Sequence, residues 1–369
     1  MVRHMKYAKA IPLFTIAFFC LSCAGSPETQ PDAETDVPQY MENVVFQSGA
    51  EYFTFRIPSL LEIPNGDLLA FAEGRESLAD EGDIDLVMKR STDNGQTWSE
   101  IQVIIDNGTD TAGNPAPVVD RTTGRIWLPY CTNPGEDPYA RRVWMTYSDD
   151  NGVSWADSRE LTDDVKPPEW KWYATGPGRS IQLSSGRLLV PANHNMEGNI
   201  RRAHAFFSDD NGETWQVGGS TGVGTDESQV VELADGTVMM NSRFTGDERL
   251  RAISLSRDGG ETWEETTLDQ ALIDPKCQGS ILMTNQGLVF SNPATQQEFP
   301  RDQLSVRISD DEGQTWPYMR EIDDGPSAYS ALGILADGRF GLVWESGDLL
   351  PYEKIRFAAF NRAWVLEAQ

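Results

Sequence analysis

The stretch SDDNGETW, residues 208–215, recurs in variant form along the chain and decides the fold. Related octapeptides, which we call boxes, begin at residues 91, 148, 256 and 309. They read STDNGQTW, SDDNGVSW, SRDGGETW and SDDEGQTW. A single catalytic centre needs its residues once, whereas a structural turn is needed in every unit of a repetitive fold. We therefore interpret the boxes as turns in which the aspartate accepts backbone hydrogen bonds and the glycine adopts a positive φ.

A second repeat alternates with the boxes and supplies the rest of each unit. It is a glycine turn followed by an apolar run, as in NGDLLAFAEGR (65–75), and it occurs six times. A further apolar run precedes each glycine turn and each box, so one unit contains four short strands. Units of four strands at this spacing are typical of a β-propeller. The sequence predicts an all-β, six-bladed β-propeller with four antiparallel strands per blade, completed by the early VVFQS stretch (44–48).

The beginning of the chain has a different composition from the rest. Basic residues precede the apolar run IPLFTIAFFCL (11–21), which is too short to span a bilayer. We expect residues 1–22 to be a signal peptide of lipoprotein type, with Cys23 lipidated, and ordinary secretion is the alternative. Residues 23–42 are acidic and Pro-rich and favour a disordered tether, and residues 43–369 form the predicted propeller. The expected location is the bacterial cell envelope or the medium.

Charge and composition exclude several classes of partner. The chain has 57 acidic and 30 basic residues and a net charge of −27, which argues against nucleic acid and against electrostatic binding to a membrane. Membrane contact is expected only through the lipid anchor. The three histidines show no metal-binding spacing, so we expect neither a metal nor a cofactor. Cys131 and Cys277 either form a disulfide or remain buried thiols.

The strand order of the repeat brings three kinds of position to one end of the propeller. These are the residues before the first strand of a unit, those at the end of its second strand, and those in the loop before its third. Such positions hold an unusual set of arginines, carboxylates and a tyrosine, which indicates one anion-binding pocket. The set is Arg56, Arg75, Asp80, Asp83, Glu227, Arg243, Arg301, Tyr329 and Glu345. Arg307 lies inside a predicted strand, and we interpret it as structural.

The stretch FRIPSL (55–60), followed by the repeated boxes, resembles the sialidases (neuraminidases) of glycoside hydrolase family 33 over the whole predicted domain. The resemblance implies a retaining exo-α-sialidase that acts on sialylated glycoconjugates. It implies the following roles: Tyr329 as nucleophile, Glu227 as its base, Asp80 as acid/base, Arg56, Arg243 and Arg301 as the carboxylate clamp, Glu345 as the partner of Arg56, and Arg75 near the 4-position of the sugar. Asp83 lies in the same loop as Asp80 and is the alternative acid/base.

Elementary chemistry agrees with these roles. Sialic acid carries a carboxylate at its anomeric carbon, which would repel a carboxylate nucleophile, whereas a neutral phenol avoids this repulsion. A phenol needs a nearby base, and arginine binds carboxylates through two parallel hydrogen bonds.

Three functions remain open at this stage. The first is hydrolysis. The second is a related activity in the same pocket: trans-sialidase, anhydro-forming sialidase or hydrolase of another nonulosonic acid. The third is non-catalytic sialoglycan binding, which would not need Tyr329 or Asp80. The NPAP (114–117) and WYATGPGRS (172–180) stretches are candidates for contacting the N-acetyl and glycerol arms of the sugar. Neither linkage preference nor oligomeric state is marked in the sequence.

Overall fold

The computed structural model describes residues 1–2, 37–134, 137 and 139–368. The predicted signal peptide, Cys23 and most of the predicted tether lie outside the described residues. The compact unit is Val37–Gln369. Its first strand, β1 (Tyr40–Gln47), begins inside the segment 23–42 that the sequence assigned to the tether. Residues 40–42 therefore belong to a sheet, because their backbone pairs with residues 358–360.

Strands dominate the described residues. The helical segments described are α1 (Thr162–Val165), α2 (Arg362–Leu366) and the 3-10 turn η1 (Glu197–Asn199). No helix among the described residues has both the length and the apolar composition needed to cross a membrane. The fold is therefore built from sheets, as the period of the repeats predicts.

The first sheet contains two consecutive antiparallel meanders. The first comprises β2 (Thr54–Glu62), β3 (Leu68–Arg75), β4 (Ile84–Ser91) and β5 (Gln102–Ile105). The second comprises β6 (Thr111–Gly113), β7 (Val118–Val119), β8 (Ile126–Asn133), β9 (Arg142–Ser148) and β10 (Arg159–Glu160). A parallel bridge between Ile84 and Thr111 joins them.

Two smaller sheets follow in the chain, each a single meander. One comprises β11 (Tyr173–Thr175), β12 (Ile181–Gln182), β13 (Leu188–Met196), β14 (Ile200–Ser208) and β15 (Gln216–Ser220). The other comprises β16 (Thr225–Glu232), β17 (Val238–Phe244), β18 (Leu250–Ser256) and β19 (Thr267–Ile273).

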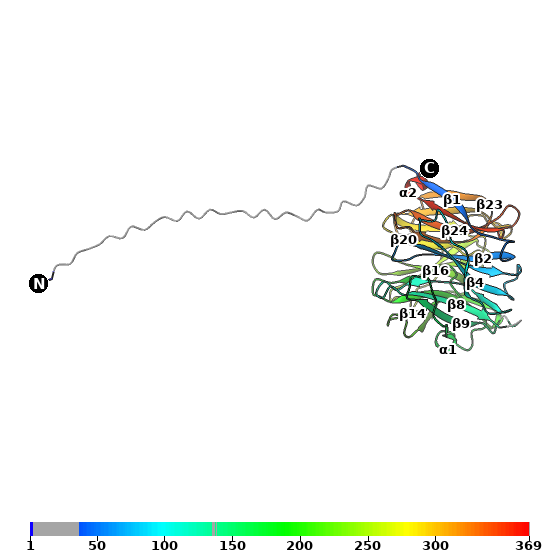
Figure 1. Cartoon of the computed structure of the whole chain (residues 1–369), viewed down its shortest axis with the longest axis horizontal. Coiled ribbons are helices and arrows are strands. Elements are labelled where there is room, and N and C mark those ends of the chain that lie inside the picture. Colours follow the sequence, from blue (N-terminus) through cyan, green and yellow to red (C-terminus); the bar gives the residue numbers. More distant parts are fainter. Residues whose placement is uncertain (3–36, 135–136, 138, 369) are drawn as a thin grey trace. The chain divides into compact units, whose positions relative to one another are not determined.

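The last sheet combines the end of the chain with its first strand. It comprises β20 (Ser280–Thr284), β21 (Gly287–Pro293), β22 (Asp302–Ser309), β23 (Tyr318–Ile334), β24 (Phe340–Ser346) and β25 (Lys354–Phe360). The long strand β23 pairs with β22 through its first half and with β24 through its second. β1, which includes residues 44–47, pairs antiparallel with β25, and Figure 1 shows β1 beside the C-terminal α2.

The boxes are structural turns, as predicted. In the box at 208–215, which lies between β14 and β15, Asp210 accepts hydrogen bonds from the Thr214 amide at 2.8 Å and the Thr214 hydroxyl at 2.6 Å. The Gly212 amide donates to the Ser208 hydroxyl at 2.8 Å. The same three contacts recur in the other four boxes. Gly212 has φ +89°, and Asn211 before it is also left-handed, which the sequence interpretation missed.

The box glycines also pack against the neighbouring meander. A Cβ on Gly212 would lie 2.3 Å from the Trp127 ring of β8, and one on Gly95 would lie 2.0 Å from the Phe357 ring of β25. Trp215 of the box packs edge-on against Trp127 at 6.2 Å between ring centroids. Each box therefore holds two successive meanders together.

Candidate active site

Five of the candidate residues lie at matching ends of strands from three different meanders. Arg56 is near the start of β2 and Glu227 is near the start of β16. Arg243 is near the end of β17, and Glu345 is near the end of β24. β17 runs antiparallel to β16, and β24 runs antiparallel to β23. Tyr329 lies on β23, three residues into its buried second half. Antiparallel pairing therefore brings these side chains to one end of the molecule.

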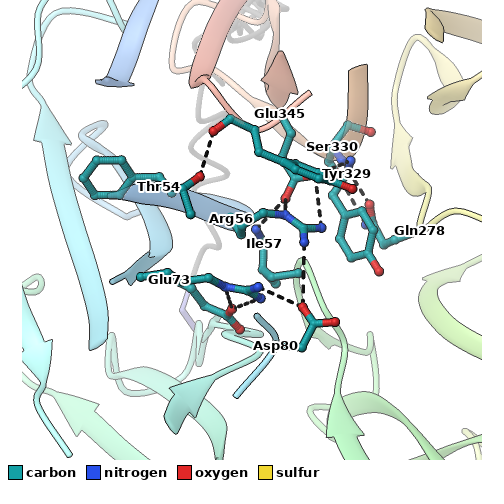
Figure 2. Close-up of polar contacts among 12 residues, drawn as sticks. Thr54, Arg56, Ile57, Glu73, Asp80, Gln278, Tyr329, Ser330 and Glu345 are labelled. Atoms are coloured by element: carbon teal, nitrogen blue, oxygen red, sulfur yellow. Dashed lines mark hydrogen bonds and ion pairs between the residues drawn. The ribbon is translucent and has the colours of Figure 1, made fainter. Parts of the chain in front are cut away.

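Glu345 is the buried centre of one half of the site. Its Oε1 accepts a hydrogen bond from Arg56 Nε at 2.8 Å and another from the Ile57 amide at 2.9 Å. Its Oε2 accepts one from the Tyr329 amide at 3.1 Å. Burial lowers the pKa of Arg56, but Glu345, Tyr352 and Tyr329 together outweigh this and raise it well above its usual value. Figure 2 shows Glu345 on one side of the Arg56 guanidinium and Asp80 on the other.

Tyr329 and Glu227 form the second part of the site. The Tyr329 hydroxyl donates to Glu227 Oε1 at 2.5 Å, and Arg243 donates to Glu227 Oε2 at 2.9 Å. The phenol is 7% exposed. Burial and the Glu227 charge raise the pKa of Tyr329 well above its usual value, despite the opposing charges of Arg243 and Arg301. The phenol is therefore neutral in the free protein, with a proton acceptor already in hydrogen-bond contact.

Asp80 lies across the pocket and contacts two arginines. Its Oδ1 is 2.8 Å from Arg75 Nη1 and 3.7 Å from Arg56 Nη1, and its side chain is 75% exposed. Loss of solvent raises the pKa of Asp80, but the charges of Arg75 and Arg56 outweigh this and lower it. Buried Glu73 holds Arg75 from the other side through the Arg75 Nε, at 2.8 Å. The Asp80 carboxylate is therefore ionised in the empty pocket.

Asp83 does not share this position. It lies in the same loop, just before β4, but its side chain is exposed and none of the described contacts joins it to Arg75 or Arg56. Its backbone carbonyl accepts a hydrogen bond from the Glu76 amide at 3.2 Å. The structure thus separates the two loop carboxylates, and Asp80 is the one brought to the arginines.

Arg301 closes the third side of the site. It precedes β22, and its Nη2 donates to the Lys276 carbonyl at 2.7 Å. Its guanidinium lies 5.8 Å from the centre of the Tyr329 ring. Arg56, Arg243 and Arg301 are therefore all within contact of Tyr329 or its hydrogen-bond partners, and each is held by a carboxylate or a carbonyl.

Three further residues belong to the site, and the sequence interpretation did not assign them. Glu73 holds Arg75, Tyr352 stacks on Arg56 at 4.0 Å, and Arg141 lowers the pKa of Asp80 through its charge. Arg141 and Tyr352 lie in loops before the third strand of a repeat unit, a kind of position that also holds other candidate residues. Glu73 lies two residues before Arg75 and so on the same face of β3. The positions of these three residues in the repeat could therefore have indicated a role in the site, but no sequence motif marks them.

The two stretches proposed to contact the sugar arms, residues 114–117 and 172–180, do not lie entirely at the candidate active site. Asn114 accepts a hydrogen bond from Arg141 at 2.5 Å, and Trp172 stacks on the same arginine at 4.0 Å, so both hold the arginine whose charge acts on Asp80. Arg179, in the second stretch, lines a separate cavity described below, which corrects its expected place at this end. Arg307 lies within β22 and donates to Asn292 at 3.3 Å, in agreement with a structural role.

A buried ion pair supports the floor of the site. Arg251 and Asp274, which are 0% and 1% exposed, lie 3.1 Å apart, and Arg251 also donates to the Cys277 carbonyl at 2.6 Å. Cys277 and Cys131 are both buried free thiols, so they do not form a disulfide. Within the ranges that the structure describes, no group of His, Cys, Asp or Glu has the arrangement of a metal site.

Comparison with known proteins places this geometry in a family. Residues 66–342 match the BNR repeat-like domain. An exo-alpha-sialidase of Arthroderma benhamiae is 30% identical over 86% of this chain and 86% of its own. A sialidase of Micromonospora viridifaciens is 35% identical over 99% of this chain. The chain belongs to the sialidase family.

Structural comparison agrees with this assignment. The Hadza microbial sialidase Hz136 superposes with a TM-score of 0.81 at 29% identity, over 88% of this chain and 69% of that one. The sialidase fold of this chain is thus all-β and of the β-propeller type. The chain spans 61% of the Micromonospora sialidase and 60% of a sialidase from Bacteroides fragilis, so it covers less than two thirds of these two relatives.

Proposed function

We propose that this chain is an exo-α-sialidase that hydrolyses terminal sialic acid from glycoconjugates with retention of configuration. The observation that carries the proposal is the 2.5 Å hydrogen bond between Tyr329 and Glu227, with Arg56, Arg243 and Arg301 around it. A pocket built only to bind an anion needs the arginines but gains nothing from a buried phenol paired with a base. Family membership and the named relatives give independent support.

The arginines serve as the substrate clamp. Three guanidinium groups around Tyr329 bring the sialic acid carboxylate, and with it the anomeric carbon, to the phenol oxygen. Arg243 Nε is buried without a hydrogen-bond partner among the described residues, so a donor is available for a substrate oxygen. Because Arg56 is already held by Glu345 and Tyr352, little side-chain freedom is lost on binding.

Bond formation at the anomeric carbon then follows in two balanced steps. The Tyr329 oxygen bonds to the anomeric carbon as Glu227 takes the phenol proton, and Asp80 gives a proton to the departing aglycone oxygen. A water next attacks the anomeric carbon while Asp80 takes its proton, and Tyr329 leaves with the proton from Glu227. Two inversions restore the original configuration.

We expect the binding of substrate to change the protonation state of Asp80. Its pKa is lowered in the empty pocket by Arg75 and Arg56. A bound sialic acid carboxylate would offset the charge of Arg56, and the sugar would exclude water from Asp80. Both effects raise the pKa of Asp80, which lets it carry the proton that the leaving group needs.

We also infer the finer organisation of the chain. The proposed organisation is six blades, of which the last joins the second half of β23 to β24, β25 and β1, and the pairing of these strands supports it. Residues 1–22 would direct export, and Cys23 would carry a lipid that holds the enzyme in the cell envelope. Mass spectrometry of the mature N-terminus, from cells that process bacterial lipoproteins, tests the anchor.

The decisive experiment follows the product of the purified chain on a fluorogenic α-sialoside by NMR. Free α-sialic acid should appear first. Tyr329→Phe should lower the rate by roughly 10²-fold or more, because the nucleophilic oxygen is gone. Tyr318→Phe, on the same strand, should leave the rate unchanged. Formation of a 2,7-anhydro product, or transfer of sialic acid to lactose, would show a related activity in place of hydrolysis. Full activity of Tyr329→Phe would refute Tyr329 as the nucleophile.

A further inference from the structure

A second cavity lies at the opposite ends of the strands that carry the candidate active site. Its volume is about 930 Å³, and its lining includes Glu62 at the end of β2 and Glu232 at the end of β16. Arg56 and Glu227 lie near the starts of the same two strands. Since a strand rises about 3.3 Å per residue, Arg56 and Glu62 are roughly 20 Å apart along β2. The cavity is therefore distinct from the proposed catalytic pocket.

Buried amide side chains fill the space between the two sites. Gln229 lies on β16 between Glu227 and Glu232, and its side chain donates to the Pro177 carbonyl at 3.3 Å. Gln278 accepts a hydrogen bond from the Ser330 amide at 3.0 Å, directly beside Tyr329, as Figure 2 shows. Both glutamines are at most 1% exposed. A ligand in the second cavity would therefore not touch Tyr329.

Arg179 brings an uncompensated charge into this cavity. Among the described residues it makes no hydrogen bond or ion pair, and its Nε is buried without a partner. Burial lowers the pKa of Arg179 more than the charge of Glu62 raises it. The Arg179 side chain is half-buried rather than fully buried, so its guanidinium loses part of its hydration and is still open to a ligand in the cavity.

Glu62 is only a partial counter-ion, because its charge acts on Arg179 without a direct ion pair. It forms no ion pair with the described residues, and burial raises its pKa despite the charge of Arg179. A carboxyl group can take up a proton and become neutral, whereas arginine stays protonated in proteins. Glu232 is already occupied by the Ser184 amide and hydroxyl, at 2.7 and 2.6 Å. Arg179 therefore remains the cationic group of this cavity that has no direct hydrogen-bond or ion-pair partner among the described residues, and an anion would supply one.

We propose that this cavity is a binding site for a small organic acid, with the carboxylate on Arg179 and hydroxyl groups directed toward Glu62. A guanidinium matches the planar carboxylate through two parallel hydrogen bonds. Ile181, Val230 and Ile281 supply apolar walls, and the volume falls in the range of small-molecule sites. The site does not depend on the proposed sialidase reaction and goes beyond it.

Isothermal titration of the full chain with three probes tests the proposal. D-gluconate supplies a carboxylate and hydroxyls, acetate supplies only the carboxylate, and sorbitol supplies only hydroxyls. Gluconate should bind with a dissociation constant of about 1 mM or tighter, acetate more weakly, and sorbitol not at all. Arg179→Met should weaken gluconate binding by roughly tenfold or more, because a charge-assisted contact is lost.

Matched variants test whether gluconate binds at Arg179 rather than at another arginine. Arg257→Met, at an exposed box position, should bind gluconate as the wild type does. Arg243→Met removes a clamp arginine of the proposed catalytic pocket and should also keep the binding. Glu62→Gln should keep carboxylate binding but reduce the preference for gluconate over acetate. Circular dichroism confirms folding, and Arg179→Met should melt no lower than the wild type without ligand, since the charge it removes has no ion-pair partner.

If Arg179→Met does not fold, Arg179→Lys carries the test, because it keeps the charge and loses the planar fork. Weaker gluconate binding by Arg179→Lys supports the proposal. The absence of gluconate binding to the wild type overturns it. Binding that survives substitution of Arg179 but is lost in Arg243→Met also overturns it, and assigns the anion to the other pocket. None of these readouts uses turnover, so they stand whether or not the chain hydrolyses sialosides.

Discussion

A carboxylate with no exposure to solvent connects the parts of the candidate active site. Glu345 accepts hydrogen bonds from the Arg56 side chain and from the backbone amides of Ile57 and Tyr329. It therefore positions both a clamp arginine and the proposed nucleophile. Ile57 has φ +57°, which is costly for a β-branched residue, and the Glu345 contact to its amide helps to hold it there.

The two loop carboxylates give the first prediction at the residue scale. Asp80→Asn should lower hydrolysis of sialyllactose by roughly 10²- to 10⁴-fold, because the sugar leaving group then lacks a proton donor. A sialoside with an acidic aryl leaving group should lose much less, since that group departs without protonation. Steady-state rates on both substrates give the comparison.

Asp83→Asn is the control for this prediction, because Asp83 lies in the same loop away from the arginines. It should keep near-normal rates on both substrates. An equal loss on both substrates by Asp80→Asn would argue for a structural role, and a loss by Asp83→Asn alone would exchange the two assignments.

At the scale of the element, the box uses two side chains to satisfy the backbone of a turn. The serine hydroxyl and the aspartate carboxylate accept the amides that a left-handed pair of residues leaves without a strand partner. The recurrence of S-x-D-x-G-x-[TS]-W follows from this geometry. In SDDNGETW, Asp210 accepts the hydrogen bonds of the turn, whereas Asp209 pairs with Arg187.

The box at residues 148–155 gives a prediction for pH. The hydrogen bond from the Ser154 hydroxyl is the largest cause that lowers the pKa of Asp150 from 3.8 to about 2. A carboxyl whose pKa is depressed by folding stabilises the fold above its unfolded pKa, and this contribution is lost as pH falls. Urea unfolding should show Asp150→Asn less stable than the wild type at neutral pH, with the difference shrinking between about pH 4 and pH 2.

Asp157→Asn, an exposed aspartate just after the same box, should show no such pH-dependent difference. A constant gap between wild type and Asp150→Asn down to about pH 2 would mean that the charge of Asp150 does not stabilise the turn.

At the scale of the whole molecule, the boxes hold neighbouring meanders together. Gly212 lies against Trp127 of the preceding meander, and Gly95 of the first meander lies against Phe357 of the last sheet. The same small residue therefore permits both the turn and close packing between meanders. β1 adds a link between the two ends of the described chain by pairing with β25.

Substitution of two glycines distinguishes the contribution of the turn to stability from the contribution of packing between meanders. Gly212 and Gly186 both have positive φ, but a Cβ on Gly212 would lie 2.3 Å from the Trp127 ring, whereas Gly186 has open space within 4 Å. Gly186→Ala should cost about 1 kcal/mol through backbone strain alone. Gly212→Ala should cost roughly 2–4 kcal/mol, because Trp127 must also move. Equal losses in urea unfolding would show that the contact between meanders contributes nothing.

Much of the candidate site was predictable because strands alternate direction in a regular order. The register of the repeats placed Arg56, Glu227 and Glu345 at one end from their positions alone, and the structure brings them together. Loop residues were harder to assign. Tyr352 and Arg141 lie in loops before third strands, which the repeat marks as candidate positions, but no motif distinguishes them from the other residues of those loops.

The strand period, the turn chemistry of the boxes and the family are all encoded in local residue types at fixed spacing. Only the tertiary structure decided that Asp80 rather than Asp83 meets Arg75, and that Arg179 faces the opposite cavity from the catalytic candidates. The physical reason is the range of the contacts. A turn is closed by hydrogen bonds between neighbours in sequence, whereas a pocket is formed by side chains from distant strands whose loops are shaped by those strands.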